Sequence, residues 1–171
     1  AEVIFSTKKK KDTIYINYNN FAKDVRPKDR VLLDDGKLAL EVVSTNKKEK
    51  VILRVIFGGV LHSRKGVNLP NTKISLPCLT PKDKKDLAFI LSEKIEWVGL
   101  SFVRSANDIK ILKKIIDKQK LHHKVIAKIE KPEAIKDIDA IIDATDAIMV
   151  ARGDLGVEVP PHKVPVHQKM I

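Results

Sequence analysis

The fold of this chain is decided by the stretch Ala147-Ile-Met-Val-Ala-Arg-Gly-Asp-Leu-Gly-Val-Glu-Val159. An apolar run that is closed by two glycines is typical of a buried parallel strand whose carboxyl end opens into a loop. A second run, Val125-Ile-Ala-Lys-Ile-Glu130, has the same form but ends on charge. Because folds built on parallel strands keep their chemistry at the strands' carboxyl ends, Asp154 and Glu130 are the first candidates for a site.

Helical and strand patterns alternate on either side of these two runs. Thr80 before Pro81 has the form of an N-cap followed by a proline at the first helical position. Apolar spacing then predicts strands and helices in turn: a helix from residue 81, a strand at 97–103, a helix at 106–117, a strand at 125–129, a helix from 132, a strand at 147–151 and the start of a helix at 164–171. Residues 74–171 are therefore predicted to form βα units around a parallel sheet.

The first part of the chain has a different period. Residues 1–73 alternate apolar and polar side chains, and turn residues such as Asp34-Asp35-Gly36 and Gly58-Gly59 separate the runs. Alternation over short runs predicts a small β domain, which we expect to be a compact barrel. Its expected strands lie at residues 14–18, 31–33, 37–43 and 51–57.

Composition and charge limit the kind of protein. The chain has 171 residues, of which 43% are hydrophobic, and this is enough for a packed core. The net charge of +11 is uneven, because residues 1–73 carry 16 Lys and Arg against 8 Asp and Glu. The chain has a single cysteine, which favours a reduced, cytoplasmic setting. It has no apolar run long enough for a membrane span and no signal-peptide core, so we expect no membrane span.

Lys128, Glu130 and Asp154 are the strongest candidates for chemistry. Side chains two apart on a strand point the same way, so Lys128 and Glu130 are predicted to face the same end of the sheet. With Asp154 from the next strand end, two carboxylates could hold Mg²⁺ or Mn²⁺ while Lys128 stabilises negative charge on a transferring group. The plainer interpretation is a solvated Lys/Glu pair, and the residues alone leave both open.

Two glycine-containing loops could bind anions. Gly153 allows close approach of a ligand, and the amides around Gly153 and Asp154 could hold a carboxylate if a helix begins there. The basic turn Ser63-Arg-Lys-Gly66 could hold phosphates. In both cases a loop without a ligand is the alternative.

Three motifs together, in this order and spacing, closely resemble the pyruvate kinase family. They are Arg64-Lys-Gly-Val-Asn-Leu-Pro70, Lys128-Ile-Glu130 and Met149-Val-Ala-Arg-Gly-Asp-Leu-Gly-Val-Glu-Val-Pro160, and the resemblance covers nearly the whole chain. It implies an α/β fold: a partial (β/α)8 TIM barrel of about three βα units in residues 74–171, preceded by a small β-barrel lid domain in residues 1–73. It also implies phosphoryl transfer from phosphoenolpyruvate to ADP, giving pyruvate and ATP.

The resemblance also implies roles for single residues. Lys128 would be the catalytic cation and would bind substrate, and Glu130 and Asp154 would be the ligands of Mg²⁺ or Mn²⁺. The amides of Gly153 and Asp154 would bind the carboxylate of phosphoenolpyruvate. The remaining residues that the resemblance implicates are Ser101 and Phe102 in the substrate pocket and Arg64, Lys65 and Asp35 at the nucleotide.

This chain departs from the family pattern at both ends. The family's first two βα units, its monovalent-cation (K⁺) ligands and its last barrel strands have no counterpart here, so we expect this chain to be an incomplete portion that is inactive alone. Members of the family are usually homotetramers, and no nucleic-acid or membrane partner is expected. Alternative functions are a metal-dependent pyruvate aldolase or lyase barrel, and a non-catalytic basic binding module.

Overall fold

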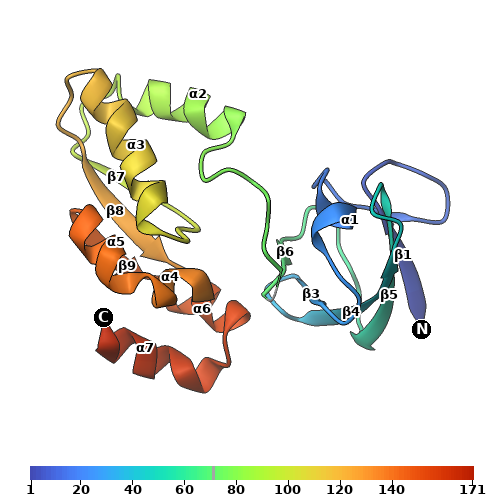
Figure 1. Cartoon of the computed structure of the whole chain (residues 1–171). Helices are drawn as coiled ribbons and strands as arrows, with labels where there is room; N and C mark the ends of the chain where they lie inside the picture. The colour runs from blue at the N-terminus through green and yellow to red at the C-terminus, as the bar shows by residue number, and fades with distance from the viewer. Residues whose placement is uncertain (71) are drawn as a thin grey trace. The chain divides into compact units, whose positions relative to one another are not determined.

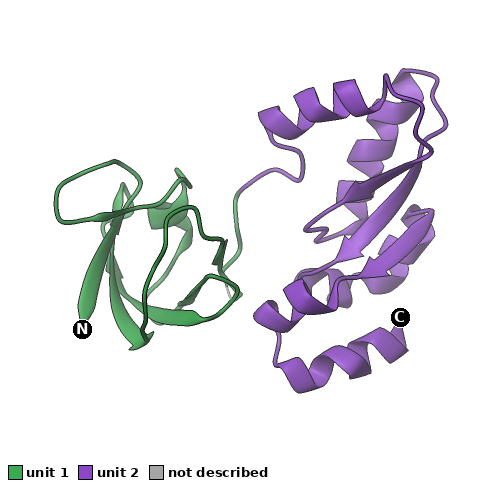
Figure 2. Cartoon of the chain, turned by 180° about the vertical axis from the view of Figure 1, so that it is seen from behind, with its two compact units in different colours: residues 1–75 green, residues 76–171 purple. Residues whose placement is uncertain are grey.

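The chain forms two compact units in a computed structural model that describes residues 1–70 and 72–171. Unit 1 comprises residues 1–75 and unit 2 comprises residues 76–171 (Figure 2). Each unit has its own core, because the buried clusters contain residues of one unit only. The change of period in the sequence placed the boundary after about residue 73, and the contacts divide the chain after Ser75.

Unit 1 is built on a six-stranded sheet with the order β2-β1-β5-β4-β3-β6 (Figure 1). Neighbouring strands are antiparallel except β1 and β2, which are parallel. Among the described residues no pairing joins β2 to β6, so closure into a barrel stays a prediction. The elements are β1 (Glu2–Ser6), β2 (Ile14–Tyr15), α1 (Phe21–Asp24), β3 (Arg30–Leu33), β4 (Leu38–Thr45), β5 (Lys50–Phe57) and β6 (Val67–Asn68).

Alternation explains how this sheet buries one face. Leu38, Leu40 and Val42 of β4 are buried, while the residues between them are partly exposed, as the period of two requires. The predicted turn before β4 is confirmed: Asp34 and Asp35 have φ of 50° and 57°, a left-handed conformation that Asp tolerates better than most residues. Of the strand expected at residues 14–18, only Ile14–Tyr15 forms β2. Elements β1, α1 and β6 were not predicted from the sequence.

Unit 2 contains the parallel three-stranded sheet β7-β8-β9 with helices packed on it (Figure 1). Residues 125, 127 and 129 of β8 are fully buried and pack with Ile109 and Leu112 of α3. The elements are α2 (Pro81–Ile90), β7 (Trp97–Leu100), α3 (Ala106–Lys118), β8 (Lys124–Ile129), α4 (Pro132–Lys136), α5 (Ile138–Ala144), β9 (Ala147–Val150), α6 (Arg152–Glu158), the 3-10 turn η1 (Pro161–Lys163) and α7 (Val164–Met170).

The strand predictions at 97–103 and 147–151 need correction. The first strand ends at Leu100, because Phe102 adopts φ of 54° and leaves the extended conformation. The second strand was expected to be buried, but β9 pairs on one side only in the described sheet and is partly exposed, with Met149 at 47%. It is followed by helix α6 and not by a loop.

One predicted helix is broken in two. The pattern from Pro132 predicted one helix, whereas α4 and α5 meet at Asp137. The Asp137 carboxylate accepts a hydrogen bond of 2.8 Å from the backbone N–H of Ala106, the first residue of α3. Asp137 therefore satisfies an amide at the start of a different helix, a tertiary contact that sequence periodicity does not contain.

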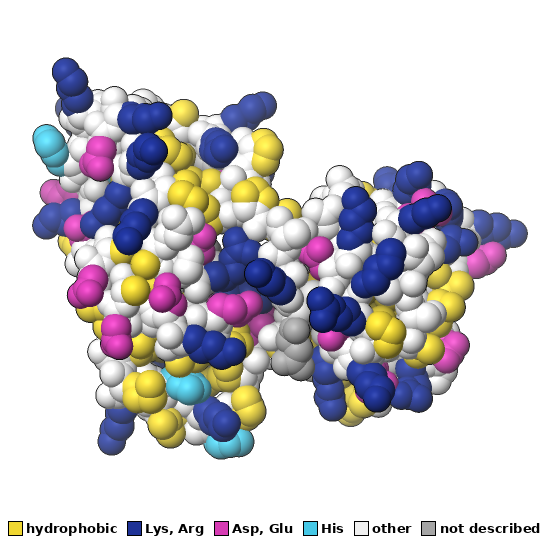
Figure 3. Space-filling model, viewed as in Figure 1, with side chains coloured by type: hydrophobic (Ala, Val, Ile, Leu, Met, Phe, Trp, Pro, Cys, Tyr) yellow, Lys and Arg dark blue, Asp and Glu magenta, His cyan; other side chains and the backbone are white. Residues whose placement is uncertain are grey.

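The surface of each unit is charged and mixed. On the face drawn in Figure 3, Lys and Arg side chains are scattered among acidic and apolar ones on both units. Trp97, the only tryptophan, lies on β7 at 40% exposure with the Lys124 ammonium 5.1 Å from its ring centroid. Within the described residues, no helix combines the length and apolarity that crossing a membrane requires.

Candidate active site

Four residues meet where β7 and β8 end, and we call them the strand-end cluster: Ser101, Phe102, Lys128 and Glu130. Lys128 lies on β8 and Glu130 follows its last residue, so the two side chains lie on the same side of the sheet. The Lys128 ammonium is 2.6 Å from Glu130 Oε1 and donates a hydrogen bond of 3.0 Å to Ser101 Oγ. The contact between Lys128 and Glu130 agrees with the prediction that both face the same end of the sheet, and the hydrogen bond to Ser101 joins the end of β8 to the end of β7.

The Glu130 carboxylate is the buried centre of the cluster. Its side chain is 1% exposed, whereas that of Lys128 is 27% exposed. Glu130 Oε2 accepts a hydrogen bond of 2.9 Å from the Phe102 N–H, and Oε1 faces the ammonium without the alignment of a hydrogen bond. A buried carboxylate needs such compensation, because desolvation of a charge without partners is very costly. The plain interpretation of a solvated surface pair therefore does not describe Glu130.

Phe102 holds the cluster through its backbone. Its φ of 54° is rare for an aromatic residue, and its side chain is 56% exposed. The ring contributes little to the core, so its burial does not explain the unusual conformation. What the turn achieves is to direct the amide of Phe102 at the Glu130 carboxylate.

The third predicted strand end lies beside the second. Ile129 pairs with Val150, and the N–H of Ala151 donates to the Ile129 carbonyl at 3.2 Å, so the chain leaves β9 next to Glu130. Helix α6 begins at once with Arg152.

Gly153 and Asp154 are the second and third residues of α6. Their amides precede the first hydrogen bond within this helix, which Leu155 donates to Ala151 at 2.9 Å. A Cβ at Gly153 would meet nothing within 4 Å, so protein packing does not demand a glycine there. The Asp154 carboxylate is exposed and makes no hydrogen bond or ion pair with another described residue. The structure therefore brings Ser101, Phe102, Lys128 and Glu130 into contact but records no contact that joins Asp154 to them.

The residues expected at the nucleotide lie on two loops of unit 1. Lys65 forms an ion pair of 2.9 Å with Asp34, and the Asp34 N–H donates to the Gly66 carbonyl at 3.2 Å, so the two loops are joined. The hydrogen bond from Lys65 lowers the pKa of Asp34 and, in turn, raises the pKa of Lys65. Arg64 and Asp35 are exposed, each with positive φ.

The ion-pair partner of Lys65 is Asp34, which the sequence did not single out. The motif Leu33-Asp-Asp-Gly36 offers two neighbouring carboxylates, of which the family resemblance implicates Asp35 alone. Because both residues adopt left-handed conformations, the direction of each side chain depends on the turn and not on a strand period. The signal for Asp34 in the sequence is the pair of neighbouring aspartates itself, because a turn can direct either carboxylate toward Lys65.

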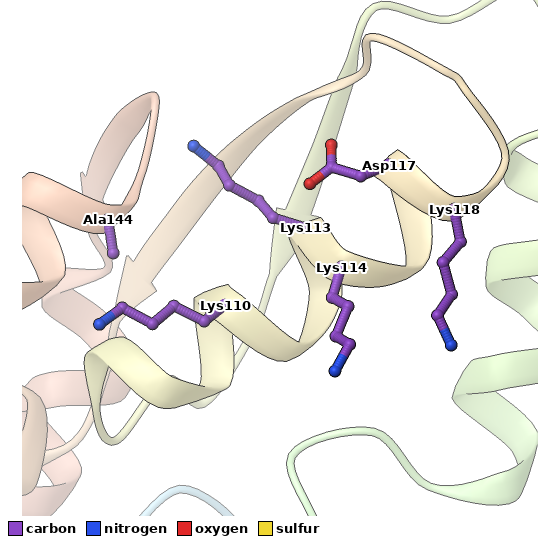
Figure 4. A pocket seen from close by; sticks show the side chains of 6 residues that line it. All are labelled: Lys110, Lys113, Lys114, Asp117, Lys118 and Ala144. Atoms are coloured by element: carbon purple, nitrogen blue, oxygen red, sulfur yellow. The ribbon is translucent and has the colours of Figure 1, made fainter.

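A hollow on helix α3 lies away from these strand ends. It has a volume of about 510 Å³ and is lined by Lys110, Lys113, Lys114, Asp117, Lys118 and Ala144 (Figure 4). Figure 4 shows Lys114 and Lys118 directed away from Lys113, so the ammonium groups do not converge on one point. Among the described residues no three His, Cys, Asp or Glu side chains form a ready metal cluster either. The strand-end cluster remains the best candidate site.

Comparisons with known proteins agree on one family. A family model described as "Pyruvate kinase, barrel domain" matches residues 2–171. The chain is 49% identical to a pyruvate kinase from Corynebacterium efficiens and 45% identical to one from Mycobacterium tuberculosis, in each case over 92% of this chain and 33% of the relative. A pyruvate kinase from Geobacillus stearothermophilus is 41% identical over 94% of this chain and 28% of that protein. The chain spans about a third of the length of these relatives.

Proposed function

Since the chain belongs to the pyruvate kinase family, we propose that it carries part of a site that transfers phosphate from phosphoenolpyruvate to ADP. The observation that carries the proposal is the contact between the Lys128 ammonium and the buried Glu130 carboxylate at the end of β8. A partly exposed cation beside a buried anion provides both signs of charge where a phosphorylated carboxylic acid must be bound and polarised. The products would be pyruvate and ATP, and we propose a cytoplasmic location.

Lys128 is the residue to which we assign the chemistry. Phosphoryl transfer depends on positioning and on stabilising charge that spreads over the transferred group. The Lys128 ammonium is fixed by Ser101 Oγ and by Glu130, and it keeps 27% of its side chain exposed. It can therefore reach a substrate while its position is set by the protein. In this role it stabilises negative charge on the phosphoryl group and on the enolate left behind.

The carboxylates of Glu130 and Asp154 are the groups we assign to Mg²⁺ or Mn²⁺. Both ions prefer carboxylate oxygens, and Mg²⁺ typically binds one or two carboxylates together with substrate phosphates. The donor set fits in two respects: Glu130 Oε1 is buried without an aligned hydrogen bond, and the Asp154 carboxylate is exposed beyond the neighbouring strand end. When bound, such an ion neutralises charge on the substrate oxygens.

The remaining assignments concern substrate recognition. We assign the carboxylate of phosphoenolpyruvate to the amides of Gly153 and Asp154, which precede the hydrogen-bonded part of α6. The open space beside Gly153 supports this, because a side chain there would occupy room that a ligand needs. Ser101 and Phe102 would line the pocket. Arg64, Lys65 and Asp35 of unit 1 would contact the nucleotide.

Mn²⁺ binding and turnover test these roles separately. Free Mn²⁺ is measured by electron paramagnetic resonance for the unaltered chain, Glu130→Gln and Lys128→Met, with Lys82→Met on the exposed surface of α2 as the matched lysine control. We expect Glu130→Gln to weaken Mn²⁺ binding by about tenfold or more. Lys128→Met should retain it, and Lys82→Met should have no effect. Equal Mn²⁺ affinity in the unaltered chain and in Glu130→Gln would refute the metal assignment.

Pyruvate formation is followed in the same set by coupling to lactate dehydrogenase, with phosphoenolpyruvate, ADP, Mg²⁺ and K⁺. Lys128→Met should lower turnover by at least about 100-fold relative to its parent, the scale of one lost electrostatic contact to a transition state. We propose that the 171 residues alone turn over slowly or not at all, so the comparison also includes a pyruvate kinase of full length with the equivalent change. ADP-dependent phosphoryl transfer distinguishes this function from an aldolase or lyase.

A further inference from the structure

A second ion pair begins at the residue after Glu130 and has no part in the proposed chemistry. Lys131 Nζ is 2.8 Å from Glu158 Oε1, and the two side chains are only 8% and 2% exposed. The pair is more fully enclosed than the other ion pairs of the described residues, each of which has a partner that is at least 26% exposed. Its burial calls for a physical reason.

The pair joins the two segments that carry the proposed metal ligands. Lys131 follows Glu130 and is the N-cap residue of α4. Glu158 is the last residue of α6 and lies four residues after Asp154, one helical turn further on and on the same face. Lys131 is therefore one peptide bond from Glu130, and Glu158 is one helical turn from Asp154.

Stability alone does not explain such a pair. The cost of removing two charges from water commonly equals or exceeds their attraction, and apolar residues of similar shape are often as stable or more so. What a buried pair can supply is a unique geometry, since two partners that are costly to separate allow one arrangement of their segments. Here the arrangement would be that of α6 against the end of β8.

We propose that Lys131 and Glu158 are a positioning pair that holds α6 against the end of β8 and so sets where Asp154 stands relative to Glu130 for a divalent cation. The inference rests on the proposed function for the identity of the cation. It assigns no contact with substrate to either residue. It does require that loosening the pair moves or frees α6 and weakens the metal site without unfolding unit 2.

The test removes both charges together. Lys131→Met with Glu158→Gln keeps the size of both side chains and leaves no uncompensated buried charge, whereas either change alone would. The matched control is Lys82→Met with Asp86→Asn, which removes an exposed ion pair on α2. Mn²⁺ affinity, thermal unfolding and hydrogen exchange of residues 152–158 are measured for the unaltered chain and both double variants.

We expect the buried double variant to keep its helical circular dichroism, to bind Mn²⁺ about 10- to 100-fold more weakly, and to exchange the α6 amides faster. The control should change none of these. The inference would be overturned if the buried double variant bound Mn²⁺ within about twofold of the unaltered chain and its α6 amides exchanged at the same rate. A twofold change in affinity is well below the loss expected when a positioning partner is removed.

Two further comparisons keep the outcome decisive. If the buried double variant does not fold, Lys131→Arg keeps the charges but changes the length, and it should still weaken Mn²⁺ binding; unchanged binding and exchange would again overturn the inference. If the unaltered chain binds no Mn²⁺, the proposed metal site fails, and exchange in α6 then decides by itself whether the pair holds this helix.

Discussion

Phe102 connects two strand ends by its backbone and not by its ring. A left-handed conformation costs a non-glycine residue about 1–2 kcal/mol. This cost is offset by a hydrogen bond from the Phe102 amide to the buried Glu130 carboxylate, because hydrogen bonds to charged groups are among the strongest in proteins. Strain of this kind persists where the surroundings hold it, and it is common at functional sites.

Substituting Phe102 separates this strain from the role of the ring. Phe102→Ala and Phe102→Gly both remove the exposed phenyl group, but only glycine relaxes φ of 54°. We therefore expect Phe102→Gly to be more stable than Phe102→Ala by about 1 kcal/mol in urea unfolding. If alanine is equal to glycine or better, the conformation at this position is not strained.

At the residue scale, side chains on strands were predictable and those on turns were not. A spacing of two residues correctly placed Lys128 and Glu130 on one side of the sheet, because strands have a fixed period. The roles of Ser101 and Phe102 came from the family resemblance, and the apolar pattern extended the strand over both residues although β7 ends at Leu100. The partner of Lys65 proved to be Asp34, whose direction depends on a left-handed turn. The roles of these residues in binding stay predictions.

Among the elements, the prediction was best for helix starts that are marked by an N-cap motif in the neighbouring residues. Helix α2 begins at Pro81 after Thr80, as expected. The Thr80 hydroxyl accepts from the Asp83 N–H at 3.2 Å, and Asp83 Oδ2 accepts from the Thr80 N–H at 2.8 Å. All of these partners lie within four residues, so the sequence contains the whole motif. At the break between α4 and α5, in contrast, the Asp137 carboxylate is paired with an amide 31 residues away, a contact that the local sequence does not contain.

Removing the cap should weaken unit 2 in a pH-dependent way. Thr80→Ala is expected to lower the free energy of unfolding by about 1 kcal/mol at neutral pH, and Thr80→Ser should restore it. The Thr80 hydrogen bonds lower the pKa of Asp83 below its ordinary value of 3.8. A lowered pKa means that this contribution is complete above pH 3.8 and is lost as the pH falls through the folded-state pKa.

Denaturant unfolding of the three proteins between pH 7 and pH 2.5 measures both effects. The difference between the unaltered chain and Thr80→Ala should shrink on acidification. A difference that stays constant across this range would show that the Asp83 carboxylate takes no part in the cap.

For the whole molecule, the change of period along the chain was the informative signal. Alternation in the first part and βα spacing in the second predicted two regions of different architecture, and the structure has two units with separate cores. Strand order was not predictable, because β1 pairs with β5 and with β2 through contacts distant in sequence. The partial exposure of β9 was also missed, since an apolar run has the same sequence at the edge of a sheet as in its centre.

Separate cores predict separate responses to cavities. Leu53 in unit 1 and Ile109 in unit 2 are both fully buried. Leu53→Ala and Ile109→Ala should each destabilise their own unit by about 2–5 kcal/mol. Hydrogen exchange measured by mass spectrometry should therefore rise in residues 1–75 for the first variant and in residues 76–171 for the second. Equal acceleration in both units by either variant would show that the chain unfolds as one cooperative body.

The placement of the aromatic residues gives each unit its own optical signal. Trp97, the only tryptophan, belongs to unit 2, while both tyrosines, Tyr15 and Tyr18, belong to unit 1. Excitation at long ultraviolet wavelength therefore reports on the parallel sheet alone, through an indole that a neighbouring ammonium already contacts. Tyrosine emission reports on the β-rich unit. A single unlabelled sample can thus show which half of the chain responds to a ligand, a denaturant or a substitution.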